Sequence, residues 1–307
     1  MPRPPRLPAS LRGRIFTAAE ADAAGLTPAQ RRGPHVVRVR HGVYRYRDTE
    51  PTVVEQLRVA QASLPADAAV SHTTALRLHG VELGPLLPLH FSTATSAQTR
   101  QSGVTLHRRN HELSSVEIDA VRSLGPERSF VDSATILGLR DLVRAGDALV
   151  RLGHTTTADL LQFTATSHLD GVLRAREAAA LVRPRVGSFR ETDLRLLITL
   201  SGLPEPACHQ QIVEPGVFAR APLVLRRHKI VVEPEGPRGA DAEHRQKAVL
   251  RRERLEAHGW TVIVVTRADV RRPATIVARV HEALVRKGYQ GPPPELTARW
   301  HQVARGA

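Results

Sequence analysis

The apolar residues of the chain recur with two different periods, and these periods predict an alternation of helices and strands. The pattern is clearest over 188–266, where Leu194, Leu197 and Ile198 recur at helical spacing before Gly202 ends the helix. Three extended runs follow, then a charged amphipathic helix and a buried strand: HQQIV, VFARAPLVL, HKIVVEPEG, a helix over about 240–258, and WTVIVVT. The stretch therefore predicts the order helix, three strands, helix, strand.

This stretch resembles the core of the PD-(D/E)xK nucleases. It is most similar to the small nuclease-like domain, related to very-short-patch-repair endonucleases, found at the C-terminus of many actinobacterial proteins. The matching pieces are SFRET, LRLLITLSGLPEP, VVEPEG, RRERLEAHGW and TVIVVTRADV. The resemblance implies an αβββαβ core over 188–288 and a metal-dependent endonuclease site, in which Glu191, Glu233 and Glu235 match the family's carboxylates.

The sequence departs from the nuclease pattern at the expected metal site. The Asp that the family places in the second strand aligns with Pro222, which has no ligating atom, and Glu235 replaces a shorter Asp. Mg²⁺ needs near-octahedral oxygen coordination, which a site without its central ligand supplies poorly. We therefore expect a degenerate, non-catalytic nuclease fold, with a Mg²⁺-dependent endonuclease or nickase as the alternative.

Each of these glutamates also has a purely structural interpretation. Glu191 lies near the start of a predicted helix, where a negative charge interacts favourably with the helix dipole. Glu233 and Glu235 are two residues apart and so point to one face of a strand end, where their charges need a cation or an arginine partner. Four nearby arginines are candidates for that partner: Arg238, Arg245, Arg251 and Arg252.

The N-terminal residues predict a small winged helix-turn-helix over 1–50. Thr17 and Glu20 have the spacing of a capping box at the start of a first helix. Thr27 and Gln30 repeat this spacing at the start of a second, very short helix. The segment HVVRVRHGVYRY then predicts a β-hairpin with a basic rim.

The segment TPAQRRGPHVVRVRHGVYRY resembles the N-terminal winged-helix domain of AbiEi-type antitoxins of type IV toxin–antitoxin systems. In the predicted hairpin we expect Val37, Val39 and Val43 to face inward. Residues 1–50 hold ten arginines against four acidic residues, a balance of 10 − 4 = +6. We expect contacts with duplex DNA from three groove-facing residues and three on the wing: Gln30, Arg31, Arg32, Arg38, Arg40 and Arg45.

The charge of the whole chain favours a polyanionic partner. Lys+Arg of 44 against Asp+Glu of 30 gives a net charge of +14. Nucleic acid is the commonest partner of such a protein. Only three of these cations are lysines, however, and the excess of arginine is also typical of a GC-rich genome. The clustering of arginine near the N-terminus is therefore a stronger indication of DNA binding than the total charge.

The region 51–152 predicts a mixed α/β middle unit. Its phrases AVSHTTALRLHGV and LGPERSFVDSA also resemble the AbiEi-type proteins. Ser71, His72 and Asp132 are the residue types of a hydrolase triad, but no GxSxG elbow accompanies them. We therefore interpret Ser71 as a helix N-cap and assign no catalysis to this region.

The remaining features narrow the class of protein. Cys208 is the single cysteine, which excludes an intramolecular disulfide and a cysteine-based zinc site, and the fifteen histidines show no metal-binding spacing. The chain shows neither an apolar signal segment nor a run long enough to span a membrane, so a cytoplasmic location is expected. A helical linker is expected over 153–187 and a flexible tail over 289–307.

Together these patterns predict an α/β protein that binds double-stranded DNA as a transcriptional regulator or an antitoxin-like component. The antitoxin resemblance implies a cognate toxin protein as a further partner. We expect no cofactor, except Mg²⁺ if the nuclease alternative holds. A protein-interaction scaffold that does not contact nucleic acid is a third hypothesis.

Overall fold

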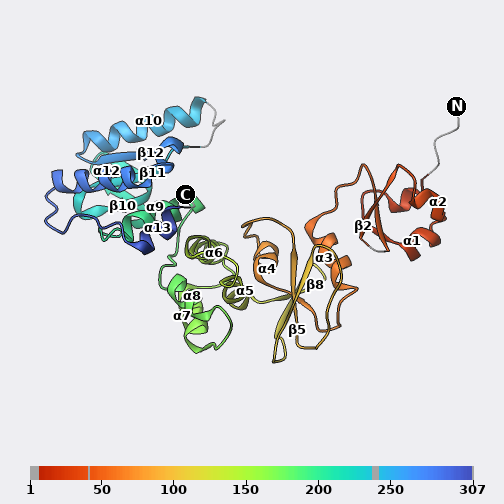
Figure 1. Cartoon of the computed structure of the whole chain (residues 1–307). Coiled ribbons are helices and arrows are strands. Elements are labelled where there is room, and N and C mark those ends of the chain that lie inside the picture. The colour runs from red at the N-terminus through yellow and green to blue at the C-terminus, as the bar shows by residue number, and fades with distance from the viewer. Residues whose placement is uncertain (1–6, 41, 237–241, 306–307) are drawn as a thin grey trace. The chain divides into compact units, whose positions relative to one another are not determined.

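The computed structural model describes residues 7–40, 42–236 and 242–305 (Figure 1). It contains helices and three sheets, which confirms the predicted mixed α/β class. The chain divides into two compact units, Met1–Ser129 and Phe130–Ala307, and each is described by itself. For four further residues the structure describes the backbone but not the side chain: Arg40, Ala242, His244 and Arg245.

The described part of residues 7–50 forms a short 3-10 helix, two short α-helices and a three-stranded sheet. Both predicted capping boxes are confirmed, because Thr17 and Thr27 each accept a hydrogen bond from the backbone N–H three residues later and the reciprocal side-chain bonds are present. The sheet has the order β1-β3-β2. The elements are η1 (Ala9–Leu11), β1 (Phe16–Thr17), α1 (Ala18–Ala23), α2 (Pro28–Arg31), β2 (Val36–Arg40) and β3 (Val43–Tyr46).

The inward face of the hairpin matches the expectation at Val43, which is buried, and differs from it on the first strand. Val36 and Tyr46 are buried, whereas Val37 and Val39 are only partly buried. The register explains this, because Val36 pairs with Tyr46 and a bulge between Arg38 and Arg40 breaks the alternation of the strand. Val36 and Tyr46 join a small core with residues from β1 and the helices, namely Leu11, Phe16, Ala21 and Leu26.

The rest of the first unit is a mixed five-stranded sheet with the order β6-β5-β4-β8-β7. The parallel pair β5 and β6 carries apolar residues such as Leu89 and Phe91 on one face, against α3 and its neighbours. The alternating positions, including His90 and Ser92, therefore face the other side. The elements are α3 (Val53–Gln61), β4 (Ala69–Val70), α4 (His72–Leu78), β5 (Leu89–Thr93), β6 (Val104–Arg108), β7 (Ser115–Ile118) and β8 (Val121–Leu124).

The second unit contains the predicted order of helix, three strands, helix and strand, as α9, β9, β10, β11, α10 and β12. The sheet has the order β12-β11-β10-β9, with a parallel β11–β12 pair. The strands are β9 (Ala207–Glu214), β10 (Val217–Leu225), β11 (Ile230–Pro234) and β12 (Thr261–Val265). The helices are α5 (Pro126–Ser133), α6 (Leu139–Arg151), α7 (Thr157–Thr166), α8 (Val172–Ala179), α9 (Phe189–Thr199), α10 (Ala242–Ala257), α11 (Arg267–Val270), α12 (Pro273–Arg286) and α13 (Ala298–Ala304).

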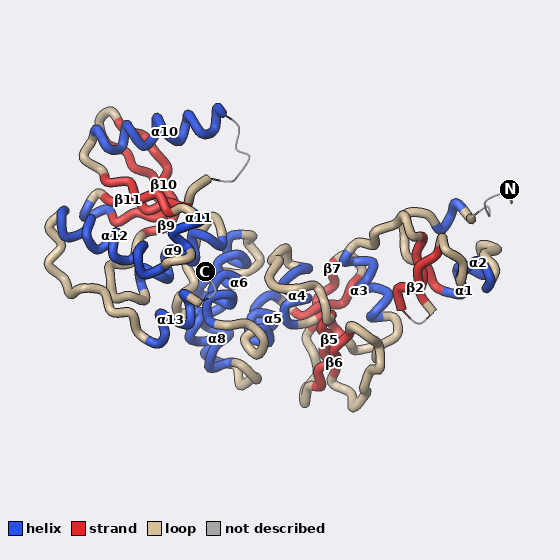
Figure 2. The backbone as a smooth tube through the Cα atoms, turned by 45° about the horizontal axis from the view of Figure 1, so that its top comes forward, coloured by secondary structure: helices blue, strands red, loops and turns tan. Residues whose placement is uncertain are grey.

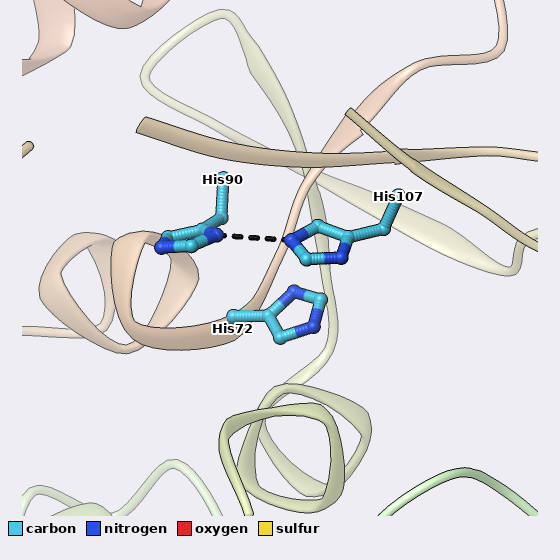
Figure 3. A group of neighbouring side chains, drawn as sticks. All are labelled: His72, His90 and His107. Carbon is cyan, nitrogen blue, oxygen red and sulfur yellow. Dashed lines mark hydrogen bonds between the residues drawn. The ribbon is translucent and has the colours of Figure 1, made fainter. Parts of the chain in front are cut away.

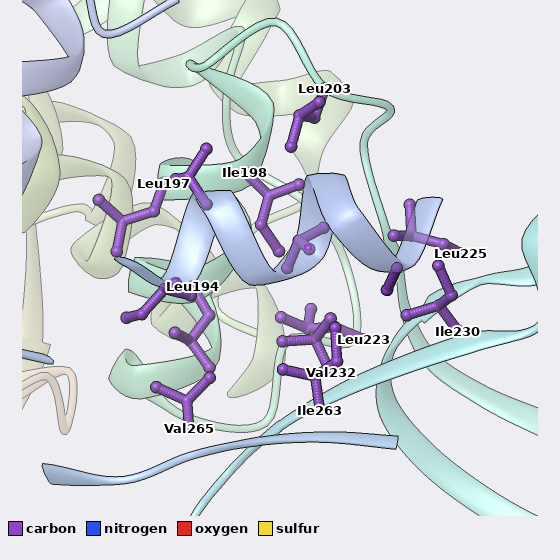
Figure 4. Packing of buried hydrophobic residues seen from close by; sticks show 14 of the residues in the cluster. Leu194, Leu197, Ile198, Leu203, Leu223, Leu225, Ile230, Val232, Ile263 and Val265 are labelled. Carbon is purple, nitrogen blue, oxygen red and sulfur yellow. The ribbon is translucent and has the colours of Figure 1, made fainter. Parts of the chain in front are cut away.

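Helices cover both faces of this sheet (Figures 1 and 2). On one face, apolar residues of α9 and α12 pack on strand residues such as Leu223 and Val232 (Figure 4). On the other face, Leu255 of α10 packs on alternating residues of β10 and β11 such as Ala221 and Val231. Cys208 belongs to the first of these cores as a buried free cysteine among apolar side chains.

The C-terminal residues are part of this unit, and the expectation of a flexible tail over 289–307 is wrong for α13. Trp300 is 2% exposed and packs in the same core as α9. Its indole N–H donates a hydrogen bond to the backbone carbonyl of Leu197 at 2.9 Å. The prolines of 292–294 suggested an unstructured tail, but they precede a helix whose Trp and Val side chains are buried.

Candidate nucleic-acid interface

The carboxylate of Glu191 holds the first turn of α9. It accepts hydrogen bonds from the backbone N–H of Gly187 at 2.8 Å and from the hydroxyl of Ser188 at 3.1 Å. The Nδ1 atom of His209 lies 3.4 Å from the same carboxylate. These contacts engage the Glu191 carboxylate at the start of the helix, where its structural interpretation placed it.

Glu233 is buried at the end of β11 and is paired with two arginines of α10. Arg251 makes a close ion pair with one carboxylate oxygen, and Arg252 lies 3.7 Å from the other. Arg251 also donates to the backbone carbonyl of Arg220 on β10 at 2.8 Å. The charge of Glu233 is therefore compensated by guanidinium groups. The two other arginines considered as partners fall outside the described side chains: Arg238 and Arg245.

Pro222 and Glu235 are the remaining positions of the predicted metal site. The last residue pair between β10 and β11 is Leu223 with Val232, so Pro222 lies one step further along, level with Glu233. Glu235 follows the strand end and is exposed. Its backbone N–H donates to the carbonyl of Val265 at 2.8 Å.

The structure does not gather the three predicted carboxylates into a metal-binding group. Within the described residues, one set of three or more His, Cys, Asp or Glu side chains has all its ligand atoms within 4.8 Å of one another, and that set consists of histidines. Glu191 and Glu233 instead have separate partners, in the α9 turn and on α10. Glu191, Glu233 and Glu235 therefore do not bring three ligand atoms within 4.8 Å of one another.

Three of the six predicted DNA-contacting residues are engaged within their own fold. The Gln30 side chain accepts from the backbone N–H of Thr27 at 2.9 Å. Arg31 is 12% exposed and pairs with Asp22 at 2.9 Å. Arg45 donates to three backbone carbonyls, the closest that of Thr49 at 2.5 Å.

The other members of the predicted set are placed differently. Arg32 and Arg38 are exposed, on the turn after α2 and on β2. Arg40 belongs to β2, but its side chain is outside the described part of the chain. Arg32 and Arg38 are therefore the members of the set that present their side chains to solvent.

The second unit has a basic hollow that the sequence did not reveal. It has a volume of about 560 Å³ and lies beside the start of α9. Arg151, Arg185 and Arg220 line it and are exposed, and no residue of its described lining is acidic. Its other polar side chains are His209, Gln210 and Gln211. These residues come from α6, the loop before α9, β9 and β10, so no local spacing in the sequence indicates the hollow.

Three histidines meet in the first unit (Figure 3). His90 Nδ1 and His107 Nε2 are 2.9 Å apart, and the His72 ring stacks on the His107 ring with 3.8 Å between centroids. Burial lowers the pKa of His72, and the nearby His107 and Arg109 lower it further. Burial is also the main reason why the pKa of His107 falls to about 4, so these rings are neutral at pH 7.

Ser71 occupies the N-cap position of α4, as expected, but its side chain does not cap the helix. Its hydroxyl is instead hydrogen-bonded to the Nδ1 atom of His72 at 2.8 Å, and α4 has no side-chain cap. Asp132, the third residue of the hydrolase-like set, belongs to the second unit. The Ser71–His72 contact is therefore part of the histidine group.

Comparison with known proteins gives no relative, since no protein-family model and no curated protein matches the chain. Among the described residues, no helix combines the length and apolar character that crossing a membrane requires.

Proposed function

We propose that this protein binds double-stranded DNA without cutting it, as a regulator or antitoxin-like component. The observation that carries the proposal is the basic hollow formed by Arg151, Arg185 and Arg220. Three exposed guanidinium groups outnumber the one described carboxylate beside the hollow, that of the buried Glu191, and so form a local positive field that favours phosphate. Glutamine side chains beside them add hydrogen-bond donors for phosphate or sugar oxygens.

The first unit supplies a second set of exposed cations. Arg32 is exposed on the turn after α2 and Arg38 is exposed on β2, where the predicted winged helix would contact duplex. Arg31 and Arg45 stabilise the same module through internal contacts, so we assign them a structural role. Contacts of this kind bind the DNA backbone and are largely independent of base sequence.

The state of Glu233 supports binding without cleavage. Two-metal phosphodiester cleavage needs carboxylates free to ligate cations on both sides of the scissile phosphate. In this chain the buried carboxylate of Glu233 is paired with Arg251 and Arg252, and the neighbouring strand has Pro222 in place of a ligand. A guanidinium group neutralises this position without offering the coordination that Mg²⁺ requires.

Fluorescence anisotropy with a labelled mixed-sequence duplex, at two salt concentrations, tests the proposal. We expect salt-sensitive binding that the triple change Arg151→Ala, Arg185→Ala and Arg220→Ala weakens, with the salt slope reduced by up to about 3 because each lost phosphate contact removes about 0.9. The matched control is Arg286→Ala, an exposed arginine of α12 that does not line the hollow. Absence of binding at low salt, or equal binding by both variants, refutes the proposal.

A plasmid assay separates binding from cleavage. Incubation with Mg²⁺ or Mn²⁺ should leave supercoiled plasmid intact. Nicking that EDTA stops and that Glu233→Ala abolishes would show that the nuclease alternative is correct. The antitoxin-like role has its own test, which is co-purification with a toxin encoded by a neighbouring gene.

A further inference from the structure

The three histidines come from three segments that the sheet of the first unit brings together (Figure 3). The parallel register of β5 and β6 pairs Ser92 with His107, so His90, two residues earlier on β5, projects from the same face. His72 begins α4, immediately after β4. One nitrogen from each ring lies within 4.8 Å of the others, a grouping unique among the described His, Cys, Asp and Glu side chains.

The hydrogen bonds of His72 define which of its nitrogens carries the proton. Arg109 Nη2 lies 3.2 Å from His72 Nε2, and a guanidinium group can only donate. Nε2 therefore has the lone pair, and Nδ1 carries the hydrogen that it donates to Ser71 Oγ at 2.8 Å. A ring whose Nδ1–H is held by an oxygen in this way has the tautomer of a metal-ligating histidine, with the lone pair on Nε2.

We propose that His72, His90 and His107 bind one divalent transition-metal ion of the zinc class. Three imidazole nitrogens suit zinc and similar ions rather than Mg²⁺ or Ca²⁺, which prefer oxygen ligands. Tetrahedral zinc with bonds of about 2.0–2.1 Å places its ligands about 3.3 Å apart. The His90 and His107 nitrogens, now 2.9 Å apart, therefore need to separate by only a few tenths of an ångström.

Binding requires one larger rearrangement, at His72. Its ring now stacks on His107 and directs Nε2 toward Arg109. The ring must turn so that Nε2 faces the ion, while Nδ1 keeps its bond to Ser71. His72 Nε2 thereby exchanges its contact with the Arg109 guanidinium group for the ion.

Two independent features of the group indicate a site rather than ordinary packing. The hydroxyl of Ser92 is fully buried on the face of the sheet that carries His90, and it has no hydrogen-bond partner among the described residues. A water or small anion at the fourth coordination position would supply that partner. His72 also has φ +54°, a left-handed conformation that is costly for a residue other than glycine.

The proposal concerns the first unit and does not depend on DNA binding by the second. Three protein ligands leave a fourth position open to water or a small anion, as in zinc sites that perform chemistry rather than those that only hold a fold together. The Arg109 guanidinium group, once it has moved off His72 Nε2, can pair with an anionic fourth ligand such as phosphate or carboxylate.

Metal titration of the untagged, full-length, EDTA-stripped chain tests the site. Isothermal titration with Zn²⁺ should give one ion per chain, and Co²⁺ should give the intense visible absorption of a four-coordinate site. His90→Ala and His107→Ala should each weaken zinc binding by at least about 100-fold, and Ser71→Ala by about 10-fold, because it holds a ligand in place. The matched control His111→Ala removes an exposed histidine of the same unit and should leave binding unchanged.

Circular dichroism shows whether each variant is folded. Zinc bound as tightly by folded His90→Ala and His107→Ala as by the wild type would overturn the proposal. If those variants do not fold, the proposal is tested on the wild type alone. In that case a weak octahedral Co²⁺ spectrum, or no rise in the melting temperature with zinc, overturns the site, while a four-coordinate spectrum with a higher melting temperature supports it.

Discussion

Replacement of Arg195 by methionine should destabilise the second unit strongly. The Arg195 side chain is fully buried, and its Nη2 lies 2.9 Å from the buried carboxylate of Asp147 on α6. Asp147 is also bonded to Thr192 Oγ1 at 2.8 Å and to the backbone N–H of Arg183 at 2.8 Å. The Arg195–Asp147 pair therefore ties α6 to α9, two helices that the sequence assigns to different domains.

The size of the effect follows from the charge that remains. Methionine fills much of the space of Arg195 but leaves the Asp147 carboxylate buried without its cation, and breaking a buried pair in this way costs about 3–5 kcal/mol. Burial already raises the pKa of Asp147, with Arg195 as the main opposing influence. Because two hydrogen bonds to the carboxylate remain, we expect a destabilisation at the lower end of this range, about 3 kcal/mol.

Urea unfolding followed by tryptophan fluorescence measures this change. Both tryptophans, Trp260 and Trp300, are buried in the second unit, so the signal reports that unit alone. The double variant Asp147→Asn, Arg195→Met should be more stable than the sum of the single changes predicts, with a coupling of about 2 kcal/mol, because no buried charge is left unpaired.

A surface arginine provides the control. Arg183 pairs with Glu205 at 2.9 Å with its side chain 36% exposed, so Arg183→Met should cost no more than about 1 kcal/mol. If Arg195→Met costs as little as Arg183→Met, the buried pair does not hold α6 on α9 and the reasoning is refuted.

Three further predictions follow from single contacts. Trp300→Ala should cost about 3–5 kcal/mol in the same urea assay, because a buried indole and its hydrogen bond are lost. Gly146→Ala should lower the melting temperature by an amount equivalent to about 1–3 kcal/mol, because a Cβ would lie 2.4 Å from a buried Val182 methyl. The hydrogen bond from Arg14 lowers the pKa of Glu20 below its usual 4.5, so this carboxylate stabilises the fold above that pH and the contribution disappears as pH falls through the lowered value. Glu20→Gln should therefore be less stable than the wild type at neutral pH and equal to it in acid.

Each of these predictions has a result that contradicts it. A Trp300→Ala chain as stable as the wild type would restore the idea of a loose C-terminal tail. An unchanged melting temperature for Gly146→Ala would show that α6 and the Val182 side chain can move apart enough to accommodate the added methyl group. A stability difference between wild type and Glu20→Gln that persists in acid would mean that the glutamate acts through packing rather than charge.

The sequence by itself determined the secondary structure of the best-patterned regions. The capping boxes at Thr17 and Thr27, the helical spacing of Leu194 and Leu197, and the αβββαβ order are all present in the structure. These features depend on residues a few positions apart, so local preferences are sufficient to specify them. The sequence also allowed a helix-start position for Glu191 and an arginine partner for Glu233, and both are present in the structure.

Only the tertiary structure decided where distant residues meet. The polar face of α9 is buried because α6 packs on it, the three histidines meet because β5 and β6 pair in parallel, and the arginine hollow draws on four separate segments. The alternation that grouped Glu233 with Glu235 could not show that Arg251 already compensates one of them. Strand register and helix packing are set by the sum of many long-range contacts, and no spacing within one segment records them.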